Sequence, residues 1–333
     1  LGDGTTTNRN SPIEIVDGNV TDVSIWGQTL FLKTNGSLWG MGQNESGQLG
    51  IDSTANRLTP IEIVSGGVSK IAAGMSHSAF VKTDGSLWAM GDNANGKLGT
   101  GTTTDRNVPV KVVDGNVTFV SAGDHFSAFL KEDGSLWTMG DNYYGQLGDG
   151  TKLDRFLPTK IVEADVAAMS AGHLHLLYLK EDGSLWAFGR NHQGQIGDGT
   201  VQDKNSSVRI VESGVLSLAA GGGTSFFIRQ DGSLWAMGDG DAGRLGHGST
   251  NDRTTPTKIV DSGVVAVDAQ NAQAYFLKND GTLWGMGRNN YGQLGDGTQT
   301  NRVLPVQVAS SVSRFEAGTE FLLYEKTDGT VWT

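Results

Sequence analysis

Glycine-rich loops that also carry carboxylates are the first feature of this sequence that could do chemistry. Residues 131–151, KEDGSLWTMGDNYYGQLGDGT, end in such a loop. A phosphate-binding loop would occur once, between a strand and a helix, and would end in Lys-Ser or Lys-Thr, whereas GQLGDGT recurs without a following helix. A calcium loop would need its carboxylate in every copy. Asp149, Asp198 and Asp296 have one, but the equivalent residues Ile51, Thr100 and His247 cannot supply it. These loops are therefore predicted to be turn-forming scaffold.

Three histidines, His125, His173 and His175, have side chains that could ligate a metal. The sequence holds no HExxH spacing, however, and no G-x-S-x-G turn that would present a nucleophilic serine. It contains no cysteine, which excludes disulfides, thiolate metal sites and a thiol nucleophile. We therefore expect no catalytic residue, no metal and no cofactor.

A pentapeptide of the type DGSLW recurs along the chain and indicates how these loops are positioned. Its copies begin at residues 35, 84, 133, 182, 231, 280 and 328, so the spacing is 49 residues five times and 48 once. A fixed period of this length marks a repeat architecture, in which each unit buries its apolar face against its neighbours. The whole chain, residues 1–333, is predicted to form a single repeat domain.

Each repeat contains four segments with the character of β-strands. One repeat reads PIEIV at 60–64, VSKIAAG at 68–74 and SAFVKTDGSLWAM at 78–90. The Asp84-Gly85 pair is a strong hairpin signal, because a type I′ turn needs positive φ at both central residues. Proline suits the first residue of a strand, since it cannot donate to the ladder. All six prolines occupy this position: Pro12, Pro60, Pro109, Pro158, Pro256 and Pro305.

Short antiparallel strands repeated in this way predict an all-β fold, a seven-bladed β-propeller of four-stranded antiparallel blades. The ends of the chain match one another. LGDG at residues 1–4 repeats LGDG at 294–297, and DGTVWT at 328–333 stops short of the next glycine loop. We therefore expect the last blade to be closed by both termini, with Pro12 to about Val16 as the strand that opens blade one.

The repeats also resemble a known family. HSAFVKTDGSLWAMGDNANGKLGTGT, residues 77–102, and its copies are similar to the repeats of the regulator of chromosome condensation (RCC) family over nearly the whole chain. The resemblance implies a seven-bladed propeller, here of bacterial type. It implies less about function, because that architecture also serves an ultraviolet-sensing plant photoreceptor, a secreted β-lactamase inhibitor and bacterial surface proteins. The nuclear guanine-nucleotide exchange factor that names the family inserts an extra β-wedge, for which repeats of 48 or 49 residues leave no room.

Two bulky residue types keep a fixed place in the repeat, and we interpret both as structural. A tryptophan at one position per blade predicts packing between blades. These tryptophans are Trp39, Trp88, Trp137, Trp186, Trp235, Trp284 and Trp332. A basic residue three positions before the proline predicts a bond to a carboxylate or carbonyl oxygen of a neighbouring blade. These residues are Arg9, Arg57, Arg106, Arg155, Lys204, Arg253 and Arg302.

Two variable loops of each repeat are expected to share one face, the loop between the second and third strands and the loop that leaves the fourth. Exposed aromatic and histidine side chains on such loops are typical of recognition surfaces. The alternative is that they are ordinary polar loops whose His77, His175 and Phe126 point inward. The predicted partner-binding residues are Trp26, Asp124, His125, Tyr143, Tyr144, His173, His192 and Tyr291.

Composition narrows the class of partner. The chain is 37% hydrophobic and 18% charged, and its net charge of −11 argues against nucleic acid and against an anionic membrane surface. No apolar run is long enough to span a bilayer. An acidic protein of this kind is expected to attract neutral or basic protein partners. The chain begins with Leu1 in the middle of a repeat, which leaves room for a signal peptide before it.

These observations favour a non-catalytic protein-interaction scaffold. Near-identical repeats rich in glycine and threonine favour a secreted or cell-surface bacterial protein, with a cytoplasmic location as the alternative. A propeller that binds a glycan or small ligand, with Trp26, Tyr143, Tyr144 or Tyr291 as stacking platforms, is the second hypothesis. Nucleotide exchange on a small GTPase is the third.

Overall fold

The computed structural model describes residues 2–7, 15, 16, 18–319 and 321–332, which form β-strands joined by turns and loops. Within these residues the helical segments are two single 3-10 turns, η1 (Ala94–Gly96) and η2 (Asp241–Gly243). The chain divides into two compact units. Unit one is Leu1–Tyr143 with Lys152–Asp165, and unit two is Tyr144–Thr151 with Val166–Thr333.

Unit one contains three four-stranded antiparallel sheets, blades 1 to 3. Blade 1 consists of β1 (Val20–Ile25), β2 (Gln28–Lys33), β3 (Leu38–Gly42) and β4 (Arg57–Val64). Blade 2 consists of β5 (Val68–Ala73), β6 (His77–Lys82), β7 (Leu87–Gly91) and β8 (Arg106–Val113). Blade 3 consists of β9 (Val117–Ala122), β10 (Phe126–Lys131), β11 (Leu136–Gly140) and β12 (Arg155–Val162).

Unit two contains blades 4 to 6 and one three-stranded sheet. Blade 4 consists of β13 (Val166–Ala171), β14 (His175–Lys180), β15 (Leu185–Gly189) and β16 (Lys204–Val211). Blade 5 consists of β17 (Val215–Ala220), β18 (Thr224–Arg229), β19 (Leu234–Gly238) and β20 (Arg253–Val260). Blade 6 consists of β21 (Val264–Gln270), β22 (Gln273–Lys278), β23 (Leu283–Gly287) and β24 (Arg302–Ala309). The last sheet consists of β25 (Val312–Ala317), β26 (Leu322–Lys326) and β27 (Val331–Trp332).

Repeated four-stranded antiparallel blades place the fold in the all-β class as a β-propeller, as predicted. The predicted number of seven four-stranded blades is wrong. The described residues form six such blades, and the seventh DGSLW-type element lies in a sheet of three strands. In each of the six blades, the fourth strand follows the tryptophan strand and pairs with it, as β4 does with β3 in blade 1. The strand predicted at Pro12 to Val16 to open blade one falls largely outside the described residues.

The blades are also cut differently from the sequence repeat. The segment that begins each repeat is the outer strand of the preceding blade, as β4 shows by pairing with β3 through Leu38 and Val64. Pro60 is therefore the fourth residue of its strand rather than the first. It lies where the register shifts between the pairs Gly40 with Ile61 and Gly42 with Arg57. A bulge on an outer strand tolerates the missing N–H group of proline.

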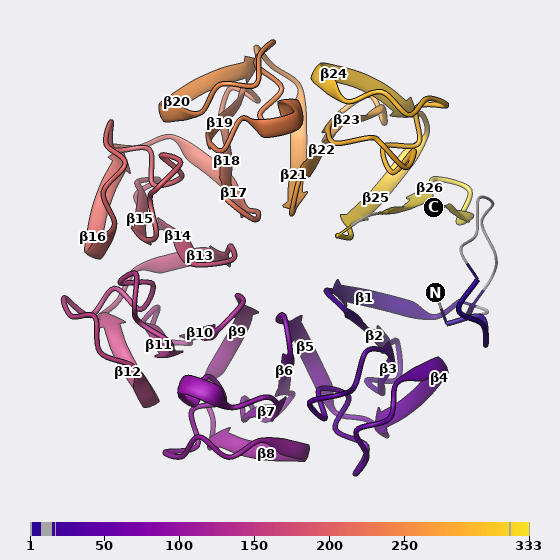
Figure 1. Ribbon diagram of the computed structural model, residues 1–333, viewed down its shortest axis with the longest axis vertical. Helices are drawn as coiled ribbons and strands as arrows, with labels where there is room; N and C mark the ends of the chain where they lie inside the picture. Colours follow the sequence, from indigo (N-terminus) through magenta and orange to yellow (C-terminus); the bar gives the residue numbers. More distant parts are fainter. Residues whose placement is uncertain (1, 8–14, 17, 320, 333) are drawn as a thin grey trace. The chain divides into compact units, whose positions relative to one another are not determined.

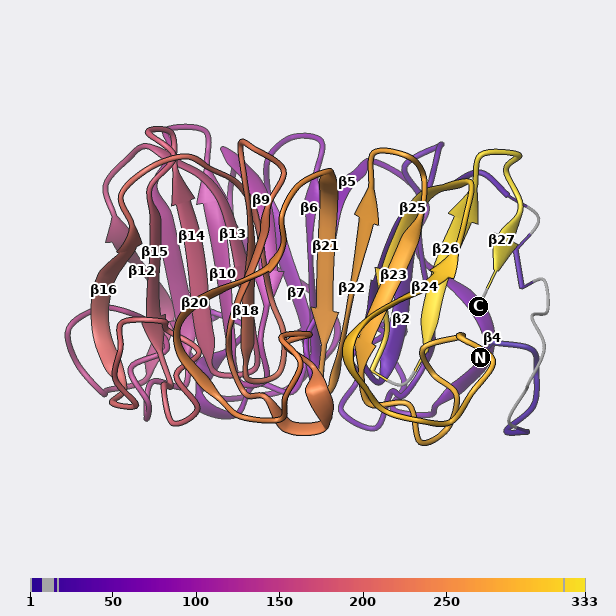
Figure 2. The ribbon, with the colours of Figure 1, turned by 90° about the horizontal axis from the view of Figure 1, so that it is seen from above.

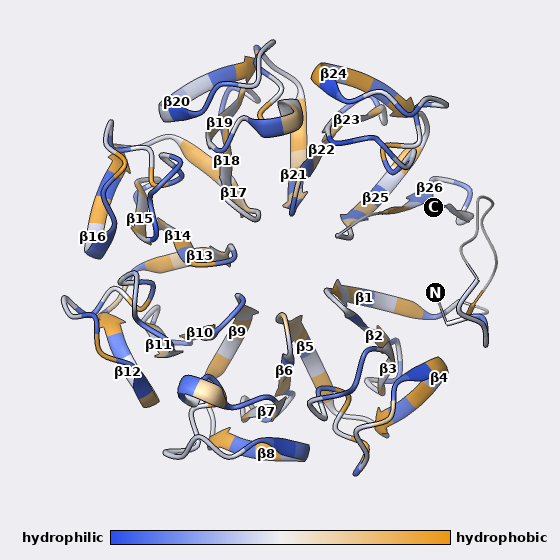
Figure 3. Ribbon diagram, viewed as in Figure 1, coloured by the Kyte–Doolittle hydropathy of each residue, from blue (hydrophilic) through white to orange (hydrophobic). Residues whose placement is uncertain are grey.

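Within each unit, consecutive blades pack face to face. In Figure 1 the inner strands β1, β5 and β9 of unit one lie side by side, and the outer strands β4, β8 and β12 lie farthest from them. One core cluster joins Val81 and Leu87 of blade 2 to Val117, Phe129 and Met139 of blade 3. Figure 3 shows how hydropathy is distributed in unit two. Inner strands such as β17 and β21 are largely hydrophobic, and the loop between β15 and β16 is largely hydrophilic. Across the described residues, no helix has the length and apolar character needed to cross a membrane.

Candidate functional site

Two loops of each blade lie at one end of its strands. We call them the inner turn, between the first and second strands, and the exit loop, between the third and fourth. They are bonded to each other, as in blade 4, where Arg190 N donates to Leu174 O at 2.8 Å. Figure 2 shows the exit loop that contains η2 at the same end of unit two as the turn between β21 and β22. The expectation that the two variable loops share one end is thus met within each blade.

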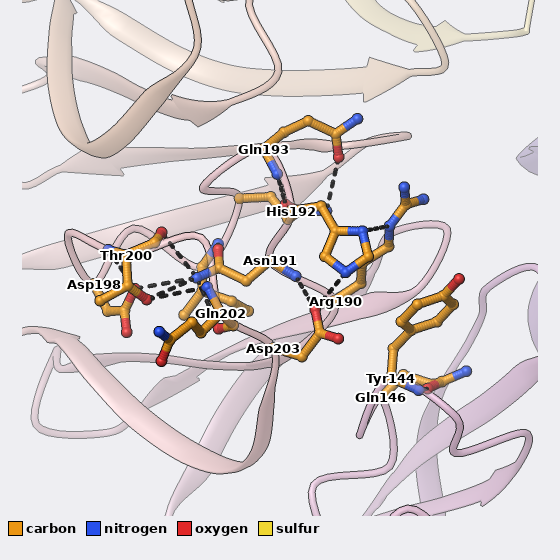
Figure 4. Close-up of polar contacts among 12 residues, drawn as sticks. Tyr144, Gln146, Arg190, Asn191, His192, Gln193, Asp198, Thr200, Gln202 and Asp203 are labelled. Carbon is orange, nitrogen blue, oxygen red and sulfur yellow. Dashed lines mark hydrogen bonds and ion pairs between the residues drawn. The ribbon is translucent and has the colours of Figure 1, made fainter.

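A buried asparagine holds each of several exit loops in one conformation. In blade 4, Asn191 Nδ2 donates to the carbonyl oxygens of Thr200 and Gln202 at 3.0 and 3.1 Å, and its Oδ1 accepts from Ile196 N at 2.9 Å. The backbone N–H of Asn191 donates to Asp203 Oδ1 at 2.9 Å (Figure 4). The Asn191 side chain therefore forms hydrogen bonds with backbone groups in the middle and at the end of the loop. Variable side chains in the loop are presented on a fixed backbone.

The repeated basic residues begin the outer strands. Arg302 Nε donates to Asp296 Oδ2, and Lys204 Nζ pairs with Asp198 Oδ2, each at 2.6 Å. These aspartates belong to the exit loop of the same blade, so the bond is not made to a neighbouring blade as expected. Three copies of the loop have no carboxylate at that position, and there the arginine Nε is buried without a hydrogen-bond partner. These arginines are Arg57, Arg106 and Arg253. Arg9 lies outside the described residues.

Six of the repeated tryptophans, those of blades 1 to 6, are half-buried, whereas Trp332 in β27 is 40% exposed. Trp137 contacts the core cluster of blades 2 and 3, stacks on Phe129 with ring centroids 6.0 Å apart, and donates from Nε1 to Ser135 Oγ at 2.8 Å. Lys131 Nζ lies 4.8 Å from the ring centroid. The stack on the second-strand aromatic recurs in blades 1 to 6. These contacts account for the tryptophans as scaffold.

Two histidines of the inner turns join blades instead of facing a partner. His77 Nε2 lies 2.8 Å from Ser127 Oγ, and His175 Nε2 lies 3.0 Å from Ser225 Oγ, each on the next blade. Because each serine donates to a loop carbonyl, it accepts the histidine proton. Both Nδ1 atoms are buried without a hydrogen-bond partner. Burial lowers the pKa of His77 and of His175 to about 3, so both are neutral at pH 7.

Four predicted partner-binding residues belong to unit one. Tyr143 is 68% exposed at the tip of the blade 3 exit loop, and Trp26 is half-buried in the blade 1 inner turn. Asp124 and His125 are half-buried in the blade 3 inner turn. Burial and then the charge of Lys97 lower the pKa of His125. Lys97 itself is buried, with a side chain 1% exposed and paired with Asp92.

The other four belong to unit two, and the structure brings two of them together. The rings of Tyr144 and His192 meet edge to face with centroids 5.5 Å apart. Arg190 joins them, with its guanidinium 5.5 Å from the Tyr144 centroid and its Nε donating to His192 Nδ1 at 3.3 Å (Figure 4). His192 Nε2 lies 3.4 Å from Asp203 Oδ1.

His173 and Tyr291 complete the predicted set. His173 lies in the blade 4 inner turn, where burial, followed by the charges of Arg244 and Arg190, lowers its pKa to about 4. Tyr291 is 68% exposed in the blade 6 exit loop, and Arg288 lies 5.4 Å from its ring centroid. The sequence reasoning missed both Arg190 and Arg288. The signal was present, because the aligned residues Asp92, Asp141 and Asp239 are acidic.

Among the described residues, no group of three or more histidine or carboxylate side chains has the geometry to hold a metal ion. The loop end combines a fixed backbone with exposed aromatic rings and oriented charges.

Comparisons with known proteins agree with this architecture. Residues 1–269 match the RCC1-like domain and residues 280–323 match the regulator of chromosome condensation (RCC1) repeat. Human WBSCR16 is similar in structure, with a TM-score of 0.81 at 22% identity, and the match covers 93% of this chain and 87% of that one. Yeast RCC1 (Prp20) bound to Kap60 gives a TM-score of 0.81 at 22% identity over 91% and 79%.

A further structure of Prp20p from Saccharomyces cerevisiae, described with its binding to Gsp1p and histones, gives a TM-score of 0.81 at 22% identity over 92% of this chain and 82% of that one. At these identities the structural likeness establishes the fold alone. No curated protein matches the sequence.

Proposed function

Because the chain belongs to the RCC1-like domain family, we propose that it is a non-catalytic module that binds a partner protein through the exit loops and inner turns of its blades. The observation that carries this proposal is the internal comparison of the repeats. Strands, tryptophans and loop-holding asparagines recur at fixed positions, whereas the exposed residues of the loops differ from blade to blade. The scaffold requires none of these exposed residues.

Exposed aromatic side chains in those loops support a protein partner. Tyr143 and Tyr291 each expose 68% of their surface on loops whose backbone is held by a buried asparagine. Rigid aromatic rings of this kind bury large areas at low entropic cost. The related Prp20 has been solved bound to Kap60, which supports a protein partner for this fold.

The experiment is a cross-linking pull-down from the organism's own surroundings, quantified by mass spectrometry. The wild type is compared with a Tyr143→Ala, His192→Ala, Tyr291→Ala variant, whose three side chains are exposed. The control is Glu132→Ala with Glu181→Ala, which changes exposed residues at the opposite, hairpin end of blades 3 and 4. We expect one protein to be retained by wild type and control and lost with the triple variant.

Equal capture by all three proteins would remove the loops as the binding site. Nucleotide exchange is tested separately, by release of a fluorescent guanine nucleotide from a purified small GTPase. Stimulated release would contradict the non-catalytic proposal.

A further inference from the structure

Arg190 stands where the scaffold uses an aspartate. In three blades the residue after the third strand is an aspartate whose Oδ1 accepts the backbone N–H two residues later. Asp92 accepts from Ala94 at 2.8 Å and Asp239 accepts from Asp241 at 2.8 Å. Asp141 does the same for its exit loop. An arginine at this place gives up that hydrogen bond, so the fold does not explain it.

The surroundings of Arg190 fix its orientation and leave its charge available. Figure 4 shows the guanidinium beside the Tyr144 ring, with Nε directed at His192. In the part of the chain that the structure describes, the two terminal nitrogens of Arg190 have no hydrogen-bond or ion-pair partner. A guanidinium stays charged at any physiological pH and binds a carboxylate through two parallel N–H groups.

His192 and Asp203 hold this arginine in place. Because His192 Nδ1 accepts from Arg190, the hydrogen-bond network assigns the imidazole proton to Nε2, which faces Asp203 Oδ1 at 3.4 Å. Asp203 is in turn fixed by the backbone N–H of Asn191. His192, Asp203 and Asn191 thus form a chain of contacts that orients the Arg190 guanidinium without neutralising its charge directly.

The use made of another arginine in unit two provides a contrast. Arg244, also in an exit loop of unit two, donates to Asp239 Oδ2 at 2.8 Å and to Asp241 O at 2.9 Å. The charge of Arg244 is therefore used within the loop.

We propose that Arg190, supported by Tyr144 and His192, binds a carboxylate of an acidic segment on the partner protein. This inference rests on the proposed function and names the chemistry of its partner. The net charge of −11 favours neutral or basic partners at long range. At physiological ionic strength, however, charges more than about 8 Å away are screened, so the nearest side chains decide the contact.

The test is fluorescence anisotropy with labelled oligoglutamate, oligoglutamine and single-stranded DNA as probes, at physiological salt. We expect oligoglutamate to bind and Arg190→Gln to raise its Kd about tenfold or more, as for loss of one bidentate charged contact. The control Arg209→Gln makes the same change of charge in β16 of the same blade, where Arg209 pairs with Glu212 at 2.9 Å.

The proposal is wrong if oligoglutamate does not bind, if Arg209→Gln weakens binding as much as Arg190→Gln, or if DNA binds more tightly than oligoglutamate. Light scattering of wild type and Arg190→Gln gives a further outcome. Self-association that is lost with the substitution would assign this surface to a second copy of the chain and also overturn the proposal.

The two proposals can fail separately. A partner captured by the loops without any affinity for oligoglutamate leaves the proposed function intact and removes the acidic segment. If oligoglutamate binds but no protein is captured, the affinity for carboxylates stands and the proposed function is removed.

Discussion

At the scale of single residues, the repeat separates side chains that the fold needs from side chains that it does not. Trp137 and Tyr143 are six residues apart, yet Trp137 is packed between blades and Tyr143 is largely exposed. The aromatic type alone does not distinguish them. Their positions in the repeat do, because a tryptophan recurs at the first and a different residue stands at the second in every other blade.

Truncation of these two residues should have unequal effects on stability. We expect Trp137→Ala to lower the free energy of unfolding by about 3 kcal/mol, at the low end for a large core truncation because the ring is half-buried. Tyr143→Ala should cost less than about 0.5 kcal/mol, as exposed substitutions do. Urea unfolding of both variants measures the difference. Similar losses would contradict the division into scaffold and surface.

At the scale of elements, the sequence predicted where the exit loop lies but not which hydrogen bonds and ion pairs it forms. Glycines and turn residues predicted a loop after the tryptophan strand, and the structure has one there in each blade, although it joins the third strand to the fourth and does not leave the blade. The role of the arginine that follows it could not be predicted, since its partner depends on how the loop folds back. In the structure the partner is an aspartate six residues earlier, as Asp296 and Arg302 show.

This finding predicts a stabilising substitution. Thr100 occupies the aspartate position in blade 2, where Arg106 Nε is buried without a partner. Thr100→Asp should supply the missing carboxylate and raise the free energy of unfolding by about 1 kcal/mol, the net contribution of a typical hydrogen bond. The control is Thr100→Asn, which has the same shape and no charge. Thermal unfolding at neutral pH compares the three proteins, and equal gains from Asp and Asn would exclude the ion pair as the cause.

At the scale of the whole molecule, buried histidines make stability depend on acidity. His77 in unit one and His175 in unit two have folded pKa values near 3, against about 6.5 in the unfolded chain. Below pH 6.5 the unfolded chain binds protons that the folded chain does not. The free energy of unfolding should therefore be highest above pH 6.5. It should fall between pH 6.5 and 3, by up to about 1.4 kcal/mol per pH unit for each histidine.

The chain itself offers the matched control for this prediction. Gln28 and Gln273 occupy the same repeat position and donate from Nε2 to carbonyl oxygens of the next inner turn. The double variant His77→Gln, His175→Gln should lose about 2 kcal/mol less stability than wild type between pH 6.5 and 5.5, because the slope is only partly developed near the unfolded pKa. Urea midpoints at the two pH values test it. Parallel pH dependences in the two proteins would show that these histidines do not carry the effect.

The sequence alone could predict the fold class, the family and the loop end of the blades, because all three depend on a periodic pattern. It could not predict where one blade ends and the next begins. A period is the same wherever it is cut, and only the pairing of β4 with β3 shows that the proline segment completes the preceding sheet. The prediction of seven four-stranded blades failed for the same reason, because it assumed that each repeat contains all four strands of its own blade. The sequence singled out tyrosines and histidines of the candidate site, whereas Arg190 was missed because it shows only as an exception to the aspartates aligned with it, Asp92, Asp141 and Asp239.

The outer strand of each blade comes from the repeat that follows it. Blade 1 takes β4 from the stretch that continues into β5 of blade 2, and the same holds for β8, β12, β16, β20 and β24. Consider one 49-residue repeat inserted by duplication. The repeat that follows it supplies the outer strand of its sheet, and its own first strand completes the sheet of the repeat that precedes it. Duplication or loss of a period leaves every interior sheet complete, so the number of blades in such a lineage can change by recombination without an intermediate that has a broken interior blade.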